Sequence, residues 1–452
     1  MNYDDSVRYL LSLGRELAAP RQPAPAGGPQ ARKFDLRNIQ ALAARMGDAH
    51  CAVPCAHIAG TNGKGSTAAM LESILRHSGL RTGLFTSPHL EKINERIRIQ
   101  GEDIGDEEFA AGFTRLHAVV EELLAAAPEA GPERPGLAAH PTYFECLTAM
   151  AFGLFARHRL DFAVYEAGMG GRLDATNIVT PEVAVITQID FDHESYLGHS
   201  IELIAGEKAG IIKPGVPVVC AAGHPQARAV IARHAAELGA RLVDVDEAGG
   251  GEFAPGICVP LPGRFQLRNA ATARAAARVL VERGFAITEE AIARGLGNTR
   301  WPGRLELLQT APDFYLDGTH NPAGARELLH FWETECAGRR IHLVYGAMRD
   351  KAVDEIAGLL FPRAATVILT QPDQPRAISA AALAELTAHL APRHEVVTAP
   401  AAAVERALEI AAADEVVFAT GSLYLAGDVR RWWRERSAAR PRPAAATRRA
   451  TR

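Results

Sequence analysis

The sequence predicts an α/β protein in which helices cover parallel β-sheets and the chain is divided between two domains. Three observations support this prediction. The chain has 452 residues, more than a single hydrophobic core usually organises. Short apolar runs alternate with segments whose apolar residues recur at helical spacing, a pattern typical of parallel sheets. The alternation breaks where Gly, Asn and Pro cluster at residues 295–304, and then resumes.

The N-terminal domain, residues 1–298, is expected to alternate strands and helices. Strands are predicted at residues 55–60, 161–168, 182–190 and 217–222. Helices are predicted at residues 4–17, 36–46, 66–79 with Gly79 as a C-cap, beyond 110, and 200–212. Loops are expected where Pro, Ala and Gly are enriched, at residues 18–31 and 126–139.

The smaller C-terminal domain, residues 299–436, repeats the alternation and is expected to be Rossmann-like. Its strands are predicted at residues 313–318, 340–347, 365–370, 394–399 and 415–422, and its helices at 322–337, 378–390 and 401–412. The chain after Trp433 is rich in Arg, Ala and Pro, so disorder is expected there and in the basic tail at 437–452. Nucleic-acid binding by this tail is the less favoured alternative.

Composition and charge give no reason to expect a nucleic-acid or membrane partner. Hydrophobic residues make up 48% of the chain, charged residues 23%, and the net charge is -4. The six cysteines lack zinc-ligand spacing, so free thiols in a reducing cytosol are expected. The N-terminus lacks the basic start and apolar core of a secretory signal, and no apolar run is long enough to span a membrane. A cytoplasmic protein is expected.

A glycine-rich loop, GTNGKGST at residues 60–67, lies between a predicted strand and a predicted helix. Glycines let backbone N–H groups approach phosphate oxygens, and a helix N-terminus adds partial positive charge. Lys64 supplies a full positive charge, and Ser66 or Thr67 a hydroxyl. The spacing is shorter than GxxxxGK[ST], so the sequence predicts a variant phosphate loop. An ordinary turn with a surface lysine is the alternative.

Acidic and histidine residues follow the predicted strands. Glu166 ends an apolar strand, and Asp190, Asp192 and His193 follow the next one. Ligands bind at the carboxyl edge of open α/β sheets, and Mg²⁺ prefers carboxylate oxygens. If these two strand ends are adjacent, Glu166 and His193 reach one metal ion; solvated loop charges are the alternative.

Two further positions are weaker signals when the residues are considered alone. Lys208 lies among apolar neighbours in a predicted helix, where a lysine usually extends its ammonium group to water. Asp317 and His320 follow a strand end in the second domain. Capping of the next helix by Asn321 before Pro322 explains part of that motif equally well.

Seven motifs occur in one order along the chain: HIAGTNGKGST, LFTSPHL, PTYFE, EAGMGGRLDATN, DHESYLGHS, EKAGIIKPG and LDGTHNP. In this order they resemble folylpolyglutamate synthase and dihydrofolate synthase of the Mur ligase superfamily, in particular the bifunctional bacterial type. The resemblance extends from about residue 36 to residue 430. It implies a P-loop-type ATPase domain followed by the second α/β domain.

The resemblance also implies a role for each residue that matches a family motif. The ATP-binding residues would be Gly60, Thr61, Asn62, Gly63, Lys64, Gly65, Ser66, Asn269, Arg304 and Asp317. The catalytic residues would be Lys64, Lys208 and His320, with Lys208 carrying a carbamate. The ligands of two Mg²⁺ ions would be Ser87, Glu166 and His193, with Glu166 shared. The dihydropteroate-binding residues would be Thr142, Tyr143, Phe144, Glu145, Leu173, Asp174 and Ala175.

The implied reaction joins L-glutamate to dihydropteroate or to folates at the expense of ATP, in a monomer, with a monovalent cation as a third cofactor to consider. The substrate carboxylate attacks the γ-phosphorus of ATP, and the glutamate amine then attacks the acyl phosphate. Closure of two domains would exclude water from this intermediate. A cell-wall Mur ligase, a monofunctional folylpolyglutamate synthase and a non-enzymatic nucleotide-binding module are the alternatives.

Overall fold

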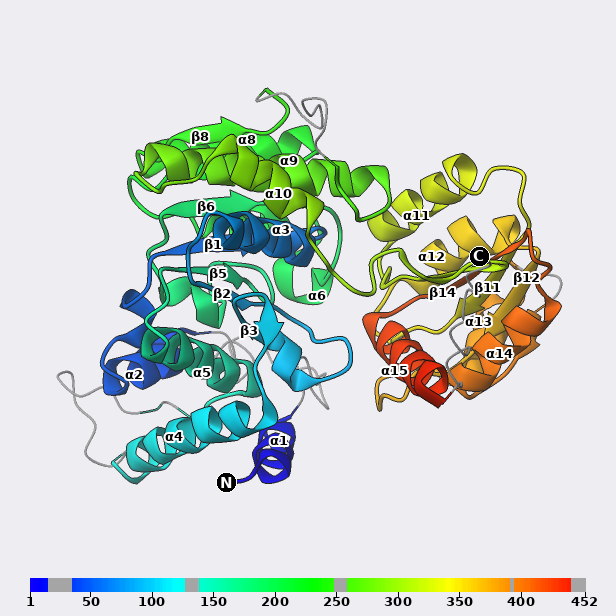
Figure 1. The fold of residues 1–452 in the computed structure, drawn as a ribbon, viewed down its shortest axis with the longest axis horizontal. Helices are drawn as coiled ribbons and strands as arrows, with labels where there is room; N and C mark the ends of the chain where they lie inside the picture. The colour runs from blue at the N-terminus through cyan, green and yellow to red at the C-terminus, as the bar shows by residue number, and fades with distance from the viewer. Residues whose placement is uncertain (15–34, 127–136, 138, 248–257, 391–393, 440–452) are drawn as a thin grey trace, which may run out of the picture. The chain divides into compact units, whose positions relative to one another are not determined.

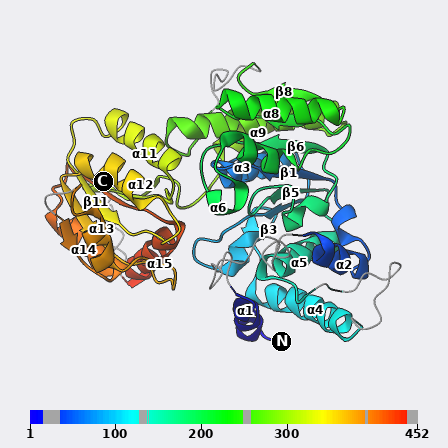
Figure 2. The ribbon, with the colours of Figure 1, turned by 180° about the vertical axis from the view of Figure 1, so that it is seen from behind.

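The computed structural model describes residues 1–14, 35–126, 137, 139–247, 258–390 and 394–439. The chain forms two compact units, Met1–Trp301 and Pro302–Arg452, and each is organised around its own β-sheet (Figures 1 and 2). The predicted α/β fold is confirmed. Among the described helices, none combines the length and apolar character that a membrane span requires.

The sheet of the first unit has eight strands in the order β4-β3-β2-β5-β1-β6-β7-β8. Their bounds are β1 Cys55–Ala59, β2 Thr82–Phe85, β3 Ile97–Ile99, β4 Glu102–Asp103, β5 Phe162–Glu166, β6 Val183–Ile186, β7 Val218–Cys220 and β8 Leu242–Asp244. Strands β2, β5, β1, β6, β7 and β8 run parallel, whereas β3 and β4 pair antiparallel. Strand β1 is buried along its whole length, as a central parallel strand should be.

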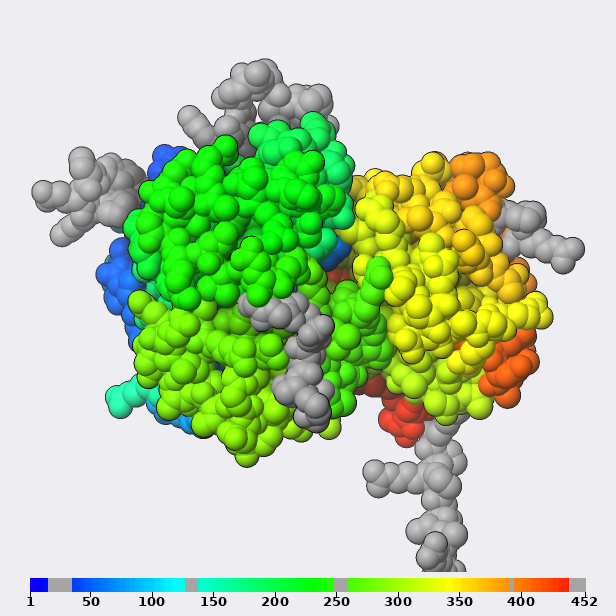
Figure 3. Space-filling view, turned by 90° about the horizontal axis from the view of Figure 1, so that it is seen from above, coloured from blue at the N-terminus to red at the C-terminus, as the bar shows by residue number. Residues whose placement is uncertain are grey.

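The helices of the first unit cover both faces of this sheet. They are α1 Tyr3–Ser12, α2 Arg37–Arg45, α3 Lys64–His77, α4 Asp106–Ala125, α5 Tyr143–Arg157, α6 Glu194–Leu197, α7 Ile201–Ala209, α8 Pro225–Glu237, α9 Arg264–Glu282 and α10 Glu289–Gly297. Side chains alternate along β5, so Val164 packs with α3, α9 and α10, whereas Tyr165 packs with α1, α2, α4 and α5. A third cluster joins α7 and α8 to β6 and β7. Figure 3 shows α8, α9 and α10 from outside.

The second unit has a six-stranded sheet in the order β13-β12-β11-β14-β10-β9. Its strands are β9 Glu306–Gln309, β10 Asp313–Leu316, β11 Ile341–Tyr345, β12 Thr366–Leu369, β13 His394–Val396 and β14 Val416–Thr420. Its helices are α11 Pro322–Thr334, α12 Val353–Leu360, α13 Ala380–Thr387, α14 Pro400–Ile410 and α15 Leu423–Ala439. All strands are parallel except β9, which pairs antiparallel with β10.

The structure corrects the sequence-based description at several places. Strands β2, β3, β4, β8 and β9 were not predicted. Each has four residues or fewer, and strands this short carry little apolar pattern. The first helix ends at Ser12 instead of 17. All six cysteines are free thiols, as expected. The loops predicted at 18–31 and 126–139 fall almost entirely outside the described residues.

The disorder predicted after Trp433 is wrong as far as Ala439, because α15 continues to that residue. The ring of Trp433 packs on Phe314 with centroids 5.4 Å apart, and Arg436 pairs with Glu405 at 3.1 Å, so the helix is held to the body of its unit. Residues 440–452 lie outside the described part of the chain. The domain limits at 298 and 436 stay predictions.

The packing of α10 on α3 depends on Gly295. A β-carbon at this position would lie 2.4 Å from the Cα atom of Ile74, and the hydroxyl of Ser73 donates a hydrogen bond of 2.7 Å to the Gly295 carbonyl. We predict that Gly295→Ala lowers the free energy of unfolding by about 1–3 kcal/mol through overpacking. Urea denaturation followed by circular dichroism measures this change. Gly297→Ala on the same helix is the control. A β-carbon there would make only an ordinary contact of 3.7 Å with the Cys258 carbonyl, so no loss from overpacking is expected, and equal losses in both variants would contradict the contact at Gly295.

Candidate active site

The predicted glycine loop begins at the carboxyl end of the central strand β1 and leads directly into α3. Strand β1 pairs with β5 on one side and with β6 on the other. The side chains that follow these three strands therefore gather at one edge of the sheet, the edge at which open α/β sheets bind ligands. Topology thus places Lys64, Glu166 and His193 on the same edge.

Two glycines of the loop occupy conformations and spaces that exclude a side chain. Gly60 has φ 155°, and a β-carbon there would lie 1.8 Å from the Thr187 hydroxyl oxygen. Gly63 has φ 86°, and a β-carbon there would lie 2.3 Å from Oδ1 of Asn269. The loop therefore approaches β6 and α9 as closely as a backbone can. Asn269, implied by the resemblance, is brought to the loop, and Thr187 is a neighbour that the sequence did not indicate.

Hydrogen bonds fix the first half of the loop to the segment after β6. The N–H groups of Thr61 and Asn62 both donate to the Gln188 carbonyl, at 2.7 and 3.3 Å. The Thr187 hydroxyl donates to the Asn62 carbonyl at 2.8 Å, and the Thr61 hydroxyl to the Asp190 carbonyl at 2.9 Å. The N–H groups of Thr61 and Asn62 are thus bonded within the protein, and they fix the conformation of the loop.

The second half of the loop offers the donors that suit an anion. The first intrahelical bond of α3 runs from the Thr67 N–H to the Gly63 carbonyl at 2.9 Å. The N–H groups of Lys64, Gly65 and Ser66 form the first turn of α3, where a helix has no intrahelical acceptor for its donors. Together with the helix dipole, these donors suit the oxygens of a phosphate group.

Two lysine ammonium groups converge on one carbonyl of this loop. Nζ of Lys64 donates to the carbonyls of Gly60 and Thr61, both at 3.1 Å, and Nζ of Lys208 donates to the Gly60 carbonyl at 2.7 Å. Lys208 does not extend to water: only 3% of its surface is exposed. Burial, and secondarily the charge of Lys64, lower the pKa of Lys208 to about 7, so its amine is partly neutral at physiological pH.

The residues implied as metal ligands lie on both sides of β1. Glu166 is buried at the end of β5, and its Oε2 accepts a 3.1 Å hydrogen bond from the Ser87 N–H. His193 has φ 53° at the start of α6, with Nε2 3.9 Å from Oδ2 of Asp192. The expectation that their strands are adjacent is wrong, because β1 pairs between β5 and β6. Within the described residues, no three His, Cys, Asp or Glu side chains could hold a metal ion by themselves.

The second glycine-rich loop, after β5, is braced against α7. The N–H of Arg172 donates to the Glu207 carbonyl at 2.8 Å, and its guanidinium pairs with the Glu207 carboxylate at 2.6 Å. A β-carbon at Gly171 would lie 2.9 Å from the carbonyl of Lys208. The loop carrying Leu173, Asp174 and Ala175 therefore packs directly against the helix that carries Lys208.

Asp174 is buried, and its carboxylate organises its own loop. It accepts hydrogen bonds from the N–H groups of Met169 and Thr176, both at 3.0 Å. The Thr176 hydroxyl is in turn 2.7 Å from Nε2 of the buried His57. Burial raises the pKa of Asp174, an effect these hydrogen bonds oppose.

The segment implied to bind dihydropteroate forms the start of α5. The Thr142 hydroxyl accepts from the Glu145 N–H at 3.2 Å, and the Glu145 carboxylate accepts from the Thr142 N–H at 2.7 Å, a capping box. Both polar side chains thus stabilise the start of the helix. The two aromatic residues between them take no part in the capping box. The Arg96 guanidinium lies 5.3 Å from the centre of the Tyr143 ring, and the Phe144 ring covers Gly168.

The residues expected in the second unit share one turn at the end of β10. The buried Asp317 accepts hydrogen bonds of 2.9 Å from the N–H groups of Leu305 and Thr319. Nδ1 of His320 donates to the Gly318 carbonyl at 2.8 Å, which assigns the ring proton to Nδ1. The side chain of Arg304 packs against Gly318. Asn321 does cap α11, as the alternative proposed.

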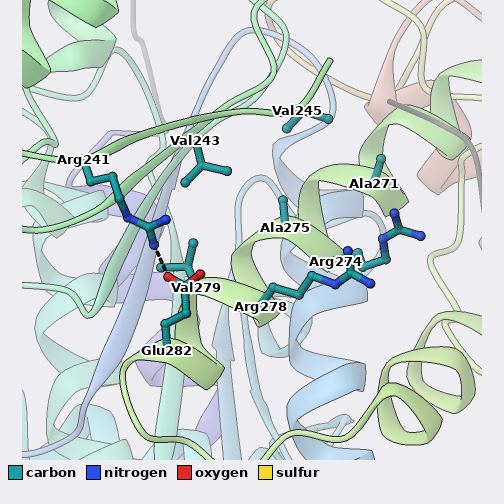
Figure 4. Close-up of a pocket in the computed structure, with 9 residues that line it drawn as sticks. All are labelled: Arg241, Val243, Val245, Ala271, Arg274, Ala275, Arg278, Val279 and Glu282. Atoms are coloured by element: carbon teal, nitrogen blue, oxygen red, sulfur yellow. Dashed lines mark hydrogen bonds and ion pairs between the residues drawn. The ribbon is translucent and has the colours of Figure 1, made fainter. Parts of the chain in front are cut away.

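A pocket between the edge strand β8 and helix α9 contains none of these residues (Figure 4). Its floor is formed by Val243, Ala275 and Val279. Two of the three arginines that line it are paired, Arg241 with Glu282 and Arg278 with Glu289, and the third, Arg274, also interacts within the protein. The pocket therefore offers no reactive group.

Two family models match the chain. Residues 58–248 match the Mur ligase middle domain, and residues 303–423 match the Mur ligase, glutamate ligase domain. The dihydrofolate synthase/folylpolyglutamate synthase of Bacillus subtilis is 38% identical over 420 residues, covering 88% of this chain and 95% of that protein. The corresponding protein of Escherichia coli is 36% identical over 341 residues, covering 72% and 74%.

Solved structures are similar along almost the whole chain. The structure of Mycobacterium tuberculosis folylpolyglutamate synthase complexed with ADP has a TM-score of 0.83 and 31% identity, covering 96% of this chain and 99% of that one. The structure of E. coli FolC in complex with DHPP and ADP has a TM-score of 0.81 and 29% identity, covering 97% and 99%.

The lowered pKa of Lys208 predicts a pH dependence of stability. Between its folded value of about 7 and its ordinary value of 10.5, the unfolded chain binds the proton that the folded chain has released. Stability should therefore rise with pH in this window, by up to about 1.4 kcal/mol per pH unit, and Lys208→Met should remove the rise. Urea unfolding of both proteins between about pH 7 and pH 9, in CO₂-free buffer, measures the difference; parallel pH profiles would contradict it.

Proposed function

Since this chain belongs to the dihydrofolate synthase/folylpolyglutamate synthase family of Mur ligases, which are ATP-dependent amide ligases, we propose that it joins L-glutamate to dihydropteroate and to the glutamate tail of folates. The observation that carries this proposal is the convergence of Lys64 and Lys208 on Gly60 at the start of α3. Relatives named for both activities, and the E. coli structure with DHPP and ADP, support dihydropteroate and folates as the acceptors.

The glycine loop and Lys64 serve the first chemical step. A carboxylate does not react with an amine in water near neutral pH, because its oxygen is a poor leaving group. Transfer of the γ-phosphoryl group of ATP to that oxygen makes phosphate the leaving group. Negative charge builds on the phosphoryl oxygens, and the Lys64 ammonium and the first-turn N–H groups of α3 would stabilise that charge.

The second step forms the amide. The nitrogen lone pair of L-glutamate attacks the acyl carbon, the bond from that carbon to the phosphate oxygen breaks, and phosphate leaves with the electron pair. The nitrogen releases a proton. We assign His320, whose Nδ1 donates to the Gly318 carbonyl, to the phosphate end of this reaction, and Asn269, Arg304 and Asp317 to ATP.

A divalent cation fits the donors around β1. The Glu166 carboxylate and the Ser87 hydroxyl belong to residues joined by a hydrogen bond, and His193 adds an imidazole from the neighbouring side of β1. We assign these residues to two Mg²⁺ ions, which would neutralise charge on the ATP phosphates. Solved relatives that contain Mn and AMPPNP support a divalent ion. A monovalent cation is proposed as a further cofactor, on the basis of the resemblance to the family alone.

The environment of Lys208 suits carbamylation. Only the neutral amine attacks CO₂, and the lowered pKa of about 7 makes that form available. The nitrogen lone pair forms the N–C bond, one C=O electron pair moves onto oxygen, and a proton passes to solvent. The product is an anion beside the Lys64 ammonium, which attracts it, whereas a second ammonium at Lys208 is repelled by Lys64. We propose that Lys208 carries a carbamate as a further anionic group of the site. We also propose that the enzyme is monomeric and cytoplasmic.

Removal of the Lys64 ammonium should abolish most of the turnover. We predict that Lys64→Ala lowers kcat by roughly 10³-fold, the cost of losing one group that stabilises transition-state charge. Phosphate release with dihydropteroate, L-glutamate and ATP measures the change, and the exposed Lys92→Ala is the matched control. Near-normal turnover of Lys64→Ala would overturn the loop assignment.

An isotope label tests the acyl phosphate. With oxygen-18 in the carboxylate of dihydropteroate, we expect one labelled oxygen in the released phosphate, detected by mass spectrometry. Phosphate without label would rule out this intermediate. Parallel reactions with tetrahydrofolate test the second activity, and phosphate release that does not require both a pterin and L-glutamate would contradict the proposed function.

A further inference from the structure

Gly65 also faces a side chain at close range, as the two other glycines of the loop do. A β-carbon at Gly65 would lie 3.0 Å from Cζ2 and 3.2 Å from Nε1 of Trp301. The neighbour of Gly63 is Asn269, which the resemblance assigns to ATP. Trp301 stands in the same relation to the loop, and none of the seven motifs includes it.

The position of the indole is fixed from a second direction. The Arg98 guanidinium lies over the Trp301 ring, 4.8 Å from its centre. Nε of Arg98 is in turn 2.7 Å from a carboxylate oxygen of Asp103. Strands β3 and β4 thereby hold the guanidinium, and the guanidinium holds the ring in a cation–π contact. The ring edge that carries Nε1 is the edge turned toward Gly65.

The indole N–H is a donor only, and it makes no hydrogen bond within the described residues. It lies beside the first turn of α3, whose own N–H groups suit phosphate oxygens. An unengaged donor at that place adds to the same anion site.

We propose that Trp301 is a nucleotide-positioning residue. Its Nε1–H donates to a phosphate oxygen of ATP held in the glycine loop, its ring supports Gly65, and Arg98 keeps the ring in place. The inference rests on the proposed function, because it needs a nucleotide in the loop. It extends that function by adding Trp301 as a residue that positions the nucleotide and Arg98 as a residue that holds the Trp301 ring.

Substitution separates the donor from the ring. Trp301→Phe keeps an aromatic ring and removes the N–H, and we expect Kd for ADP and AMPPNP with Mg²⁺ to rise roughly tenfold, as for one hydrogen bond to a charged group. Arg98→Gln should weaken binding to a smaller degree by freeing the ring. KM for L-glutamate should not change in either variant. Calorimetric titration measures Kd, and steady-state kinetics measure KM.

The second unit offers a matched control. Trp432 carries Arg436 over its ring at 5.1 Å, so Trp432→Phe and Arg436→Gln remove an equivalent pair that belongs to the other unit. Both should bind nucleotide as the wild-type protein does. Trp301→Ala would be informative only if it folds, and Trp301→Phe and Arg98→Gln keep the test valid if it does not.

Each outcome decides the inference. Wild-type affinity in folded Trp301→Phe would overturn the donor assignment, even if Trp301→Ala bound weakly. A rise in KM for L-glutamate equal to the rise in Kd would indicate a general structural role and would also overturn it. Failure of the wild-type protein to bind nucleotide would refute the proposed function, which is a separate result.

Discussion

The close approach of the backbone at Gly60 is the constraint on which the site depends. The Gly60 carbonyl accepts from both Lys64 and Lys208, and its α-carbon faces Thr187 without room for a side chain. A larger residue would separate β1 from β6 at the point where the loop begins. Both lysines would then lose their common acceptor, so the position of two charges depends on one glycine.

Helix α7 is held in place by the same arrangement. It presents Lys208 to Gly60 and accepts the second glycine-rich loop along its backbone, where Gly171 and Arg172 contact the end of the helix. The buried Asp174 then fixes that loop from within. The two glycine-rich loops thus brace one another through α7, although the 99 residues from 68 to 166 separate them in the chain. Such bracing holds reactive groups within the narrow limits that catalysis needs.

The sequence was sufficient to predict the α/β fold, the strand–loop–helix at Gly60 and the residues that end β5 and β6. These features are local, because an apolar run, a glycine cluster and a helical period occupy consecutive positions. The order of the strands in the sheet depends on contacts between distant segments. Strand β1 is remote in sequence from β5 and β6, so its position between them could not be predicted from any one segment. Thr187 and Trp301 went unnoticed for the same reason. Each is an ordinary residue until the fold brings it against a glycine of the loop.

The capping box at Thr142 and Glu145 shows the limit of arguing from motifs. A sequence motif does not distinguish residues that stabilise the backbone from residues that face a ligand. The hydrogen bonds make this distinction here. Thr142 and Glu145 bond to one another, whereas the rings of Tyr143 and Phe144 lie against Arg96 and Gly168. The same test applied to Asp174 and Asp317 finds two carboxylates engaged by backbone N–H groups.

The electrostatics of Lys64 and Lys208 then favour an anion at the loop. Two ammonium groups share one carbonyl here, and burial, followed by the charge of Lys64, lowers the pKa of Lys208. The repulsion between them falls if Lys208 loses its proton, gains a carboxylate, or meets the phosphates of a bound nucleotide. All three changes make the charge near the N-terminus of α3 more negative, and the partial positive charge of that helix end favours such a change. A bound triphosphate would therefore reduce the repulsion between the two lysines at this edge of the sheet.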